Sequence, residues 1–260
     1  MLITAKDNPK IKELRKLYSS RRERLKQGLF VIEGVRGCRD ALRDLEDIRA
    51  VFYTEGALGS LDLTLPDRVS EDRRFLITDE LAEKISDTHS SQGIFVVAKR
   101  LDKPFEAAKL KADGKYLILA ELQDPGNLGT MIRTADAVGL DGVVLAGSCV
   151  DLYNPKTVRS AVGSMPRVDI FIEKDSRQVL EGFARRGIKT AAAVIEGGEE
   201  IRRFDFSRGC AVVIGNEGRG LDDETVRLCS HKVTISMSGH IDSLNAAAAA
   251  TIFLWEMTKQ

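Results

Sequence analysis

The sequence predicts an α/β protein with two domains, the second built on a mostly parallel sheet. Strand-like and helical segments alternate through the second half of the chain, a pattern typical of a parallel sheet with helices on both faces. The length of 260 residues suits one large domain or two ordinary ones. A charged stretch containing Pro104, residues 101–114, is expected to link a domain over 1–100 to one over 115–260.

In the first half, helix start signals alternate with short apolar runs. Asn8 is expected to cap a helix that begins at Pro9 and runs to about Lys26. Thr78 is expected to cap another, whose first turn carries two acidic residues. The remaining predictions are a helix over Val35–Leu45 and strands over Leu29–Glu33, Ile48–Tyr53 and Ile94–Lys99. These elements predict a smaller, mixed α/β domain.

The second half contains five strand-like segments with helical segments between and after them. The predicted strands are Tyr116–Ala120, Gly142–Leu145, Lys189–Val194, Ala211–Ile214 and Lys232–Ile235. The predicted helices are Leu128–Val138, Asp175–Arg186 and Ser243–Met257.

Composition excludes several classes of protein. No run approaches the roughly 18 apolar residues of a membrane span. The first residues lack the apolar core of a signal peptide, so a cytoplasmic protein is expected. The four cysteines form no C-x-x-C pair and the three histidines are scattered, so we expect reduced thiols and no metal site.

A basic segment lies near the start of a chain whose formal net charge is zero. Eight basic residues fall between Lys10 and Lys26, opposed only by Glu13 and Glu23. Local patches rather than totals govern contact with phosphates. The segment is therefore a candidate polyanion contact, with a solvated helix face as the alternative.

Three segments of the second half carry candidate chemistry. The first, Glu121–Gly139, passes from a strand through a glycine-rich turn into a helix, where Asn127 can act as the cap and Arg133 lies six residues further on. A helix N-terminus with free N–H groups is a ready anion site. The alternative is a plain capping residue and a surface arginine.

The second segment, Val213–Leu221, places several glycines directly after a buried strand. Glycine allows close approach of backbone to a ligand, but the spacing is neither the dinucleotide fingerprint nor a P-loop. The third, Ile235–Asn245, runs into five consecutive alanines. Ser243 or Asp242 can cap that helix. His240 lies inside this segment, which makes it a candidate ligand contact, although a surface-loop histidine is the simpler interpretation.

In this order, the three segments resemble the signature motifs of the SpoU/TrmH family of RNA ribose methyltransferases. The resemblance implies a SPOUT domain with a C-terminal trefoil knot, a feature that sequence patterns alone could not predict. It also implies S-adenosylmethionine as cofactor and a homodimer with each active site near the subunit interface. Ser236 stands where many relatives have proline.

The resemblance also implies two sets of site residues. The polar, catalytic set is Asn127, Arg133, Glu217, Ser243 and Asn245. The cofactor-binding set is Gly215, Ile235 and Leu244, with neighbours at Leu145, Ala146, Gly147 and Gly218.

The first half resembles the L30e-like substrate-binding domain of many SpoU-type enzymes, through Phe30–Gly34 and Ile85–Gly93. With RNA implied as substrate, the basic segment becomes a candidate RNA contact through Lys10, Arg15, Arg21, Arg22 and Arg24. A domain of this type favours 23S ribosomal RNA as substrate. The alternatives are a transfer RNA ribose methyltransferase, an enzyme that methylates a base, and an RNA-binding protein with an inactive SPOUT-like domain.

The implied reaction is attack of a ribose 2′-hydroxyl on the sulfonium methyl group, which requires removal of a proton and alignment of the nucleophile. The family's usual proposal makes the arginine of the first motif, here Arg133, the activating group. Because a guanidinium is almost never deprotonated, two roles stay open for Arg133: base, or electrostatic stabiliser of the alkoxide and a phosphate.

Overall fold

The computed structural model describes residues 2–59, 65–88, 90–239, 241 and 243–259 in full, with only the backbone of residues 60 and 61. His89, His240 and Asp242 lie outside the described residues. The chain folds into two compact units. The first contains residues 1–101 together with 151–166, and the second contains 102–150 and 167–260. The expected division had assigned residues 151–166 to the second domain.

The first unit is a five-stranded mixed sheet with helices on both faces. Its strands are β1 (Leu2–Ile3), β2 (Leu29–Glu33), β3 (Ile48–Tyr53), β4 (Arg74–Ile77) and β5 (Ile94–Lys99), in the order β1-β4-β3-β5-β2. The β4 strand is parallel to β1 and β3, whereas β5 is antiparallel to β3 and β2. Its helices are α1 (Pro9–Ser19), α2 (Arg21–Gln27), α3 (Val35–Asp44), α4 (Glu55–Leu61), α5 (Asp79–Ile85) and α7 (Pro155–Ala161), with a 3₁₀ turn at Glu71–Arg73.

The expected single helix from Pro9 to about Lys26 is wrong, because the backbone leaves the helical region at Ser20. There φ is −119° and ψ is 113°. The Ser20 hydroxyl accepts a hydrogen bond from Glu23 N–H, so this residue starts a second helix. The start of α1 is confirmed, with Asn8 as cap and Pro9 at the first position.

The second unit is an eight-stranded sheet in which every neighbouring pair is parallel. The strand order is β11-β13-β10-β12-β7-β8-β9-β6. The strands are β6 (Lys103–Pro104), β7 (Lys115–Ala120), β8 (Gly142–Ala146), β9 (Ile170–Glu173), β10 (Lys189–Ala193), β11 (Glu199–Glu200), β12 (Cys210–Ile214) and β13 (His231–Thr234). The helices are α6 (Pro125–Val138), α8 (Ser176–Arg185), α9 (Asp223–Leu228) and α10 (Ala246–Lys259), and 3₁₀ turns lie at Ala107–Lys109 and Met165–Arg167.

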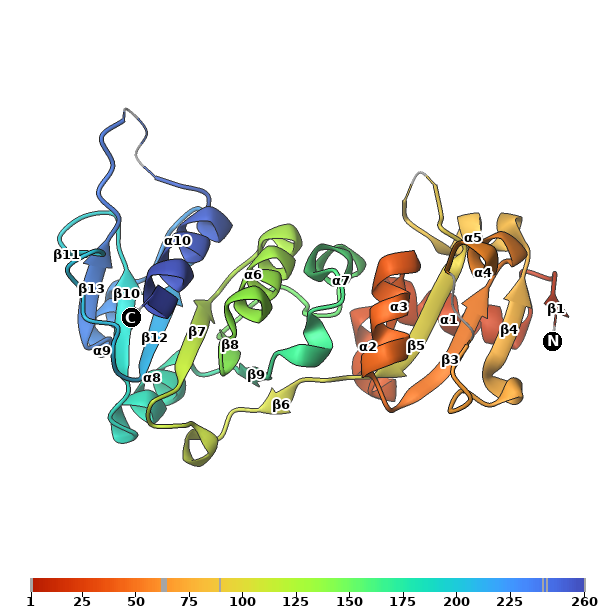
Figure 1. Ribbon diagram of the computed structural model, residues 1–260, viewed down its shortest axis with the longest axis horizontal. Coiled ribbons are helices and arrows are strands. Elements are labelled where there is room, and N and C mark those ends of the chain that lie inside the picture. Colours follow the sequence, from red (N-terminus) through yellow and green to blue (C-terminus); the bar gives the residue numbers. More distant parts are fainter. Residues whose placement is uncertain (1, 62–64, 89, 240, 242, 260) are drawn as a thin grey trace. The chain divides into compact units, whose positions relative to one another are not determined.

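Helices cover both faces of this sheet, as the alternating pattern predicts. In Figure 1, α6 (green) and α10 (dark blue) lie side by side, and they pack on each other. On the opposite face, Phe183 and Leu180 of α8 pack against Tyr116, Ile118 and other strand residues. Side chains of a strand alternate between the two faces of the sheet. Because helices cover both faces, the central strands are buried on both sides and their sequences are continuous apolar runs.

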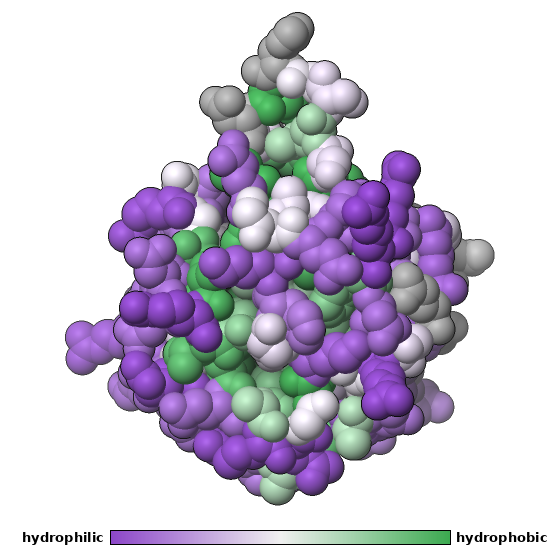
Figure 2. Space-filling view, turned by 90° about the vertical axis from the view of Figure 1, so that its left-hand side faces the viewer, coloured by the Kyte–Doolittle hydropathy of each residue, from purple (hydrophilic) through white to green (hydrophobic). Residues whose placement is uncertain are grey.

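Among the described residues, no helix is long and apolar enough to cross a membrane. Figure 2 looks onto one end of the molecule. The surface on that side is largely hydrophilic, and some apolar groups are exposed among the polar ones.

Candidate active site

The carboxyl ends of two neighbouring strands bring the first two motifs together. The β7 strand ends at Ala120 and pairs in parallel with β12, which ends at Ile214. Parallel neighbours end at the same edge of a sheet, where α/β proteins usually bind their ligands. The turn that opens α6 and the glycine-rich turn after β12 are therefore neighbours.

Glu217 joins these two turns through its carboxylate. One oxygen accepts from the Gln123 N–H at 3.0 Å, and the other from the Asp124 N–H at 2.8 Å and the Asn127 side-chain amide at 3.1 Å. Partial burial of the carboxyl favours its neutral form, but the hydrogen bonds outweigh this and lower the pKa of Glu217. Glu217 therefore holds the start of α6 as a carboxylate.

The third motif joins the same network through Asn245. Its amide nitrogen donates to Asn127 Oδ1 at 3.1 Å. The Asn245 Oδ1 accepts from the N–H groups of Ala247 and Ala248, at 2.9 and 3.2 Å. Three of the five residues expected to be catalytic, Asn127, Glu217 and Asn245, are thus linked in one chain of hydrogen bonds.

Two capping predictions need correction. Asp124, rather than Asn127, is the N-cap of α6, and it accepts from the Asn127 N–H at 2.7 Å. The side chain of Asn127 is thereby left for the network. At the start of α10, the side chain of Asn245 bonds the first helical N–H groups, whereas Ser243 is two residues too early.

The glycines of the second motif form a tight turn. Asn216 and Gly220 exchange two backbone hydrogen bonds, and a Cβ on Gly215 would lie 2.3 Å from the Gly220 carbonyl carbon. Only glycine fits there. The Asn216 amide also donates to the Glu121 carbonyl oxygen at 3.1 Å. Asn216 thus fixes the turn to the first motif, a contact that the catalytic set did not include.

Arg133 and Ser243 are not part of the network. Arg133 is exposed on α6 and has no hydrogen bond or ion pair with any residue that the structure describes. It lies six residues beyond Asn127, about 9 Å along the helix. Ser243 is also exposed. It lines a cavity instead.

An apolar cavity beside the network contains two of the expected cofactor residues. Ile235 and Leu244 line it, together with Ser243. The sequence interpretation missed the other lining residues, which are Ala193, Val194, Ile195, Met237, Ala249 and Phe253. The sequence did offer a signal for Ala193, Val194 and Ile195, because they lie at the carboxyl end of the predicted strand Lys189–Val194.

The other expected cofactor residues are placed differently. Leu145 and Ala146 are buried within β8, and Ala146 belongs to the core on the α8 face. Gly147 follows that strand with φ at 73°. Gly215 and Gly218 lie in the turn around Glu217. None of these five lines the cavity.

Most of the expected RNA contacts are available, but one is not. Lys10, Arg15, Arg21 and Arg22 are exposed on α1 and α2. Arg24 is only 4% exposed. It pairs with Asp151 at 2.6 Å and donates to two carbonyl oxygens at the end of α1. A role for Arg24 as a surface phosphate contact is therefore wrong.

No group of three or more His, Cys, Asp or Glu side chains in the described part of the chain is arranged to hold a metal ion. His231 packs against Phe204 and lies 2.9 Å from the Ser230 hydroxyl. Burial raises the pKa of Cys149, near the first motif, to about 11, so this thiol is protonated at neutral pH.

A parallel sheet with a polar network and an apolar cavity at the ends of its strands defines an α/β enzyme of the kind that binds a small-molecule ligand there. Comparison with known proteins narrows this class. Residues 114–255 match the model of the SpoU rRNA Methylase family, and residues 8–96 match the MRM3-like substrate binding domain. The chain belongs to the SpoU rRNA methylase family.

Similarity to individual proteins extends over the whole chain. An uncharacterized tRNA/rRNA methyltransferase from Synechocystis is 32% identical over 99% of this chain and 93% of its own. The 23S rRNA (guanosine(2553)-2′-O)-methyltransferase RlmP of Bacillus subtilis is 29% identical over 98% of both. The crystal structure of an AdoMet-bound rRNA methyltransferase from Sinorhizobium meliloti superposes with a TM-score of 0.87 at 26% identity, covering 100% of this chain and 97% of that one.

Proposed function

We propose that this protein transfers a methyl group from S-adenosylmethionine to a ribose 2′-hydroxyl of 23S ribosomal RNA. The observation that carries the proposal is that the polar network and the apolar cavity meet at two consecutive residues. Asn245 completes the polar network, and Leu244, its neighbour in the chain, lines the apolar cavity. A polar site for a ribose and an apolar site for a cofactor therefore share one segment.

The residues of the cavity suit S-adenosylmethionine. Its walls are aliphatic and aromatic, from Ile195, Ile235, Leu244 and Phe253, with the Ser243 hydroxyl as a polar group. Sites for cofactors commonly combine apolar walls with a few polar groups. When bound, the cofactor supplies the electrophilic methyl group. Gly215, Gly218 and Leu145–Gly147 stay as proposed secondary contacts.

The polar residues receive distinct roles in this proposal. Asn127 and Asn245 orient the ribose through amide groups that their mutual hydrogen bond holds in place. Glu217 positions Asn127 and the turn before it. Arg133 stabilises the developing alkoxide and a neighbouring phosphate, since a guanidinium is a poor base. Ser243 helps to orient the ribose.

We further propose that the protein is a homodimer and that its C-terminal segment is threaded as a trefoil knot, as the SPOUT resemblance implies. The exposed face of α10 supports the dimer, because Trp255 is 57% and Ile252 37% exposed. Thr251 on that face lies 3.4 Å from Thr134, the neighbour of Arg133 in α6. A partner seated there would bring Arg133 to a subunit interface.

Sedimentation of the full chain and of Trp255→Glu tests the dimer. We expect the wild type to sediment as a dimer and the variant as a monomer, because the glutamate would bury a charge at an apolar contact. A folded wild-type monomer that is fully active would remove the proposal.

The exposed basic residues of α1 and α2 are proposed to contact RNA phosphates. These residues are Lys10, Arg15, Arg21 and Arg22, whereas Arg24 is buried and is left out of the set. The similarity to a 23S rRNA enzyme favours ribosomal RNA and therefore action in the cytoplasm, where ribosomes assemble. The Synechocystis relative, described for both RNA classes, keeps transfer RNA as the second candidate.

One assay separates these candidates. The protein is incubated with labelled S-adenosylmethionine and either unmodified 23S ribosomal RNA or total transfer RNA, and the RNA is digested to nucleosides. We expect label in a 2′-O-methylnucleoside from the 23S RNA alone. Label in a base-methylated nucleoside, or in neither RNA, would contradict the proposal.

A further inference from the structure

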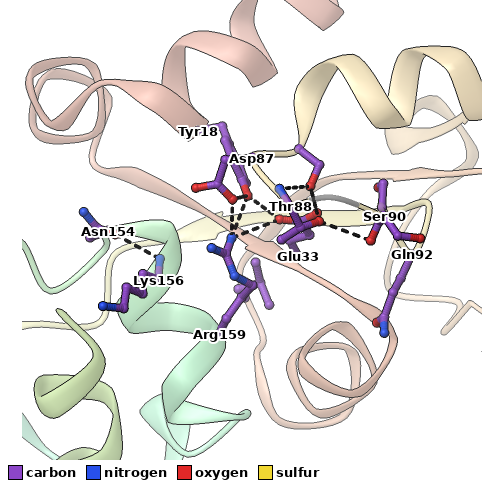
Figure 3. Close-up of polar contacts among 12 residues, drawn as sticks. Tyr18, Glu33, Asp87, Thr88, Ser90, Gln92, Asn154, Lys156 and Arg159 are labelled. Carbon is purple, nitrogen blue, oxygen red and sulfur yellow. Dashed lines mark hydrogen bonds and ion pairs between the residues drawn. The ribbon is translucent and has the colours of Figure 1, made fainter.

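The first unit contains a cavity of its own, and its lining residues lie outside the three motifs. It lies where the end of β2, the start of α3, the loop before β5 and α7 meet, and its volume is about 230 Å³. Figure 3 shows Glu33, Thr88, Ser90, Gln92 and Arg159 among the polar side chains of this region. Its lining combines Glu33, Gly34, Arg36 and Gly37 with Thr88, Ser90 and Gln92 and with Val158, Arg159 and Val162.

Arg159 is held in place from one side. Its Nη1 lies 2.7 Å from Asp87 Oδ1, 2.8 Å from the Tyr18 hydroxyl and 3.3 Å from Glu33 Oε2. Burial, reinforced by the hydrogen bond to Glu33, raises the pKa of Tyr18 well above its usual range, so its hydroxyl stays protonated. The Nε and Nη2 groups of Arg159 have no partner among the described residues. The guanidinium therefore presents an oriented edge of donors.

Gln92 is also fixed, with its donors left over. Its Oε1 accepts from the Val35 N–H at 2.7 Å, which defines the orientation of the amide. The amide nitrogen has no partner in the described part of the chain. Arg36 is exposed on α3 and likewise makes no hydrogen bond or ion pair with another described residue. The cavity is thus rich in unused donors.

The carboxylate of the cavity is already occupied. Glu33, only 8% exposed, receives hydrogen bonds from Tyr18 and Ser86 and pairs with Arg159. The Thr88 hydroxyl donates to the Ser90 carbonyl oxygen at 3.2 Å. A ligand must therefore offer acceptors to the free donors of Arg159, Gln92 and Arg36.

The apolar wall carries backbone strain. Val162 adopts the left-handed conformation, with φ at 45° and ψ at 55°, which is a genuine outlier for a β-branched residue. Such strain persists where the surrounding structure demands it, commonly at binding sites. The valine side chain lines the cavity together with Val158. Glycine or asparagine would suit this backbone better but would not supply the wall.

We propose that this cavity binds a single unstacked nucleotide of the RNA substrate. Its base would lie against Val158 and Val162, with acceptors on its edge facing Arg159 and Gln92 and its phosphate near Arg36. Sequence-specific recognition of RNA commonly uses bases splayed out of loops, held by hydrogen bonds to their edges. The volume is below the roughly 300–1,000 Å³ of sites for drug-sized molecules, which suits one base, with its sugar and phosphate at the rim of the cavity, and excludes a duplex.

The site is composite along the sequence. Val158, Arg159 and Val162 come from residues 151–166, which lie between the first and second motifs of the methyltransferase half. Residues 1–101 alone would lack one wall and the oriented arginine. Recognition of the nucleotide therefore requires both halves of the chain, and this inference rests on the proposed function.

The test uses the full-length protein and an unmodified 23S ribosomal RNA transcript, with RNA affinity and thermal unfolding as readouts. Val162→Gly relieves the strain and removes the wall, so we expect an equal or higher melting temperature with RNA affinity about tenfold weaker. Gln92→Glu keeps the acceptor for Val35 N–H and replaces the donors by a charge, so we expect a similar loss. Arg36→Ala should also weaken binding.

Arg43→Ala is the matched control, because Arg43 lies two turns further along α3, outside the cavity, and pairs with Asp40 and Asp44. It should leave RNA affinity within about twofold. S-adenosylmethionine affinity should be unchanged in every variant. Wild-type RNA affinity in Val162→Gly and Gln92→Glu would overturn the inference while leaving the proposed function intact. A wild-type protein that neither binds nor methylates the RNA would overturn both.

Discussion

Three amide and carboxylate side chains show how short motifs far apart in sequence become one site. Asn127, Glu217 and Asn245 come from separate segments, and parallel pairing of β7 with β12 brings the first two to one edge. The sequence could identify the residue types. It could not predict that Asp124 would take over the capping role and leave Asn127 for the network, because both residues are competent caps.

Glu217 is expected to matter for geometry and for acid stability. Glu217→Gln replaces one acceptor oxygen by a donor that faces N–H groups, so we expect destabilisation of roughly 1–3 kcal/mol and a loss of methyl transfer near 100-fold. Glu181→Gln, on the exposed surface of α8, should change neither. Melting curves and single-turnover assays would measure both effects.

The lowered pKa of Glu217 predicts the sign of a pH effect. Its contribution to stability is present above the ordinary glutamate pKa of about 4.3 and is lost as the pH falls through the lower folded-state value. The stability difference between wild type and Glu217→Gln should therefore shrink on acidification below about pH 4. A difference that grows there would contradict the assignment.

Arg133 is expected to act on the reaction rather than on cofactor binding. Arg133→Ala should reduce methyl transfer by about 100-fold or more. Affinity for S-adenosylmethionine should stay nearly unchanged, because Arg133 does not line the cavity. Arg185→Ala on α8 is the control. A stabilising role predicts partial rescue by Arg133→Lys with an unchanged pH profile, whereas a base would shift that profile. Parallel loss of cofactor affinity and activity would show that Arg133 holds the cofactor.

At the scale of elements, the sequence was most informative where apolar runs and caps agreed. The central strands of both units were predicted to within a residue or so at each end, because buried strands are largely continuous apolar runs bounded by turns. The missed helices and strands are all short, between two and seven residues: β1, β4, β6, β9, β11, α4, α7 and α9. Short segments carry too few positions for a periodic pattern.

The short helix α2 carries two kinds of arginine, the buried Arg24 and the exposed Arg21 and Arg22. Arg24→Ala leaves Asp151 and two carbonyl oxygens without a buried donor, so we expect a loss of about 3–5 kcal/mol in the free energy of unfolding. Arg21→Ala and Arg22→Ala should change stability by less than about 0.5 kcal/mol. The double variant should instead weaken RNA binding and flatten its salt dependence by roughly 0.7–0.9 per lost contact. An unchanged salt slope would remove these residues from the RNA interface.

At the scale of the whole molecule, the chain crosses between the two units three times, after Leu101, Val150 and Pro166. Composition indicated only the first crossing, because the charged linker over residues 101–114 lies there. The other two follow from tertiary packing. Tyr153 packs against Phe30 with ring centroids 4.5 Å apart, and Arg24 pairs with Asp151. No local pattern in residues 151–166 predicts partners more than a hundred residues away.

Because residues 151–166 belong to the first unit, the boundaries of a stable C-terminal fragment are affected. A fragment of residues 113–260 would expose Tyr153, Val158, Ala161 and Met165, which are buried in the first unit. We expect that fragment to aggregate, and replacing 151–166 by a glycine–serine linker to restore a soluble fragment that binds S-adenosylmethionine. Sedimentation and calorimetry would compare the two. A well-behaved original fragment would show that the segment does not need the first unit.

The central claim is that the methyl group goes to a ribose oxygen, and a single substitution in the RNA tests it most directly. Once the methylated nucleotide has been mapped, a substrate with a 2′-deoxy sugar at that position removes the nucleophile while keeping the base and the phosphates. We expect this RNA to bind with nearly unchanged affinity and to accept no label from S-adenosylmethionine. Continued methyl transfer to the deoxy substrate would place the methyl group on a base and contradict the account.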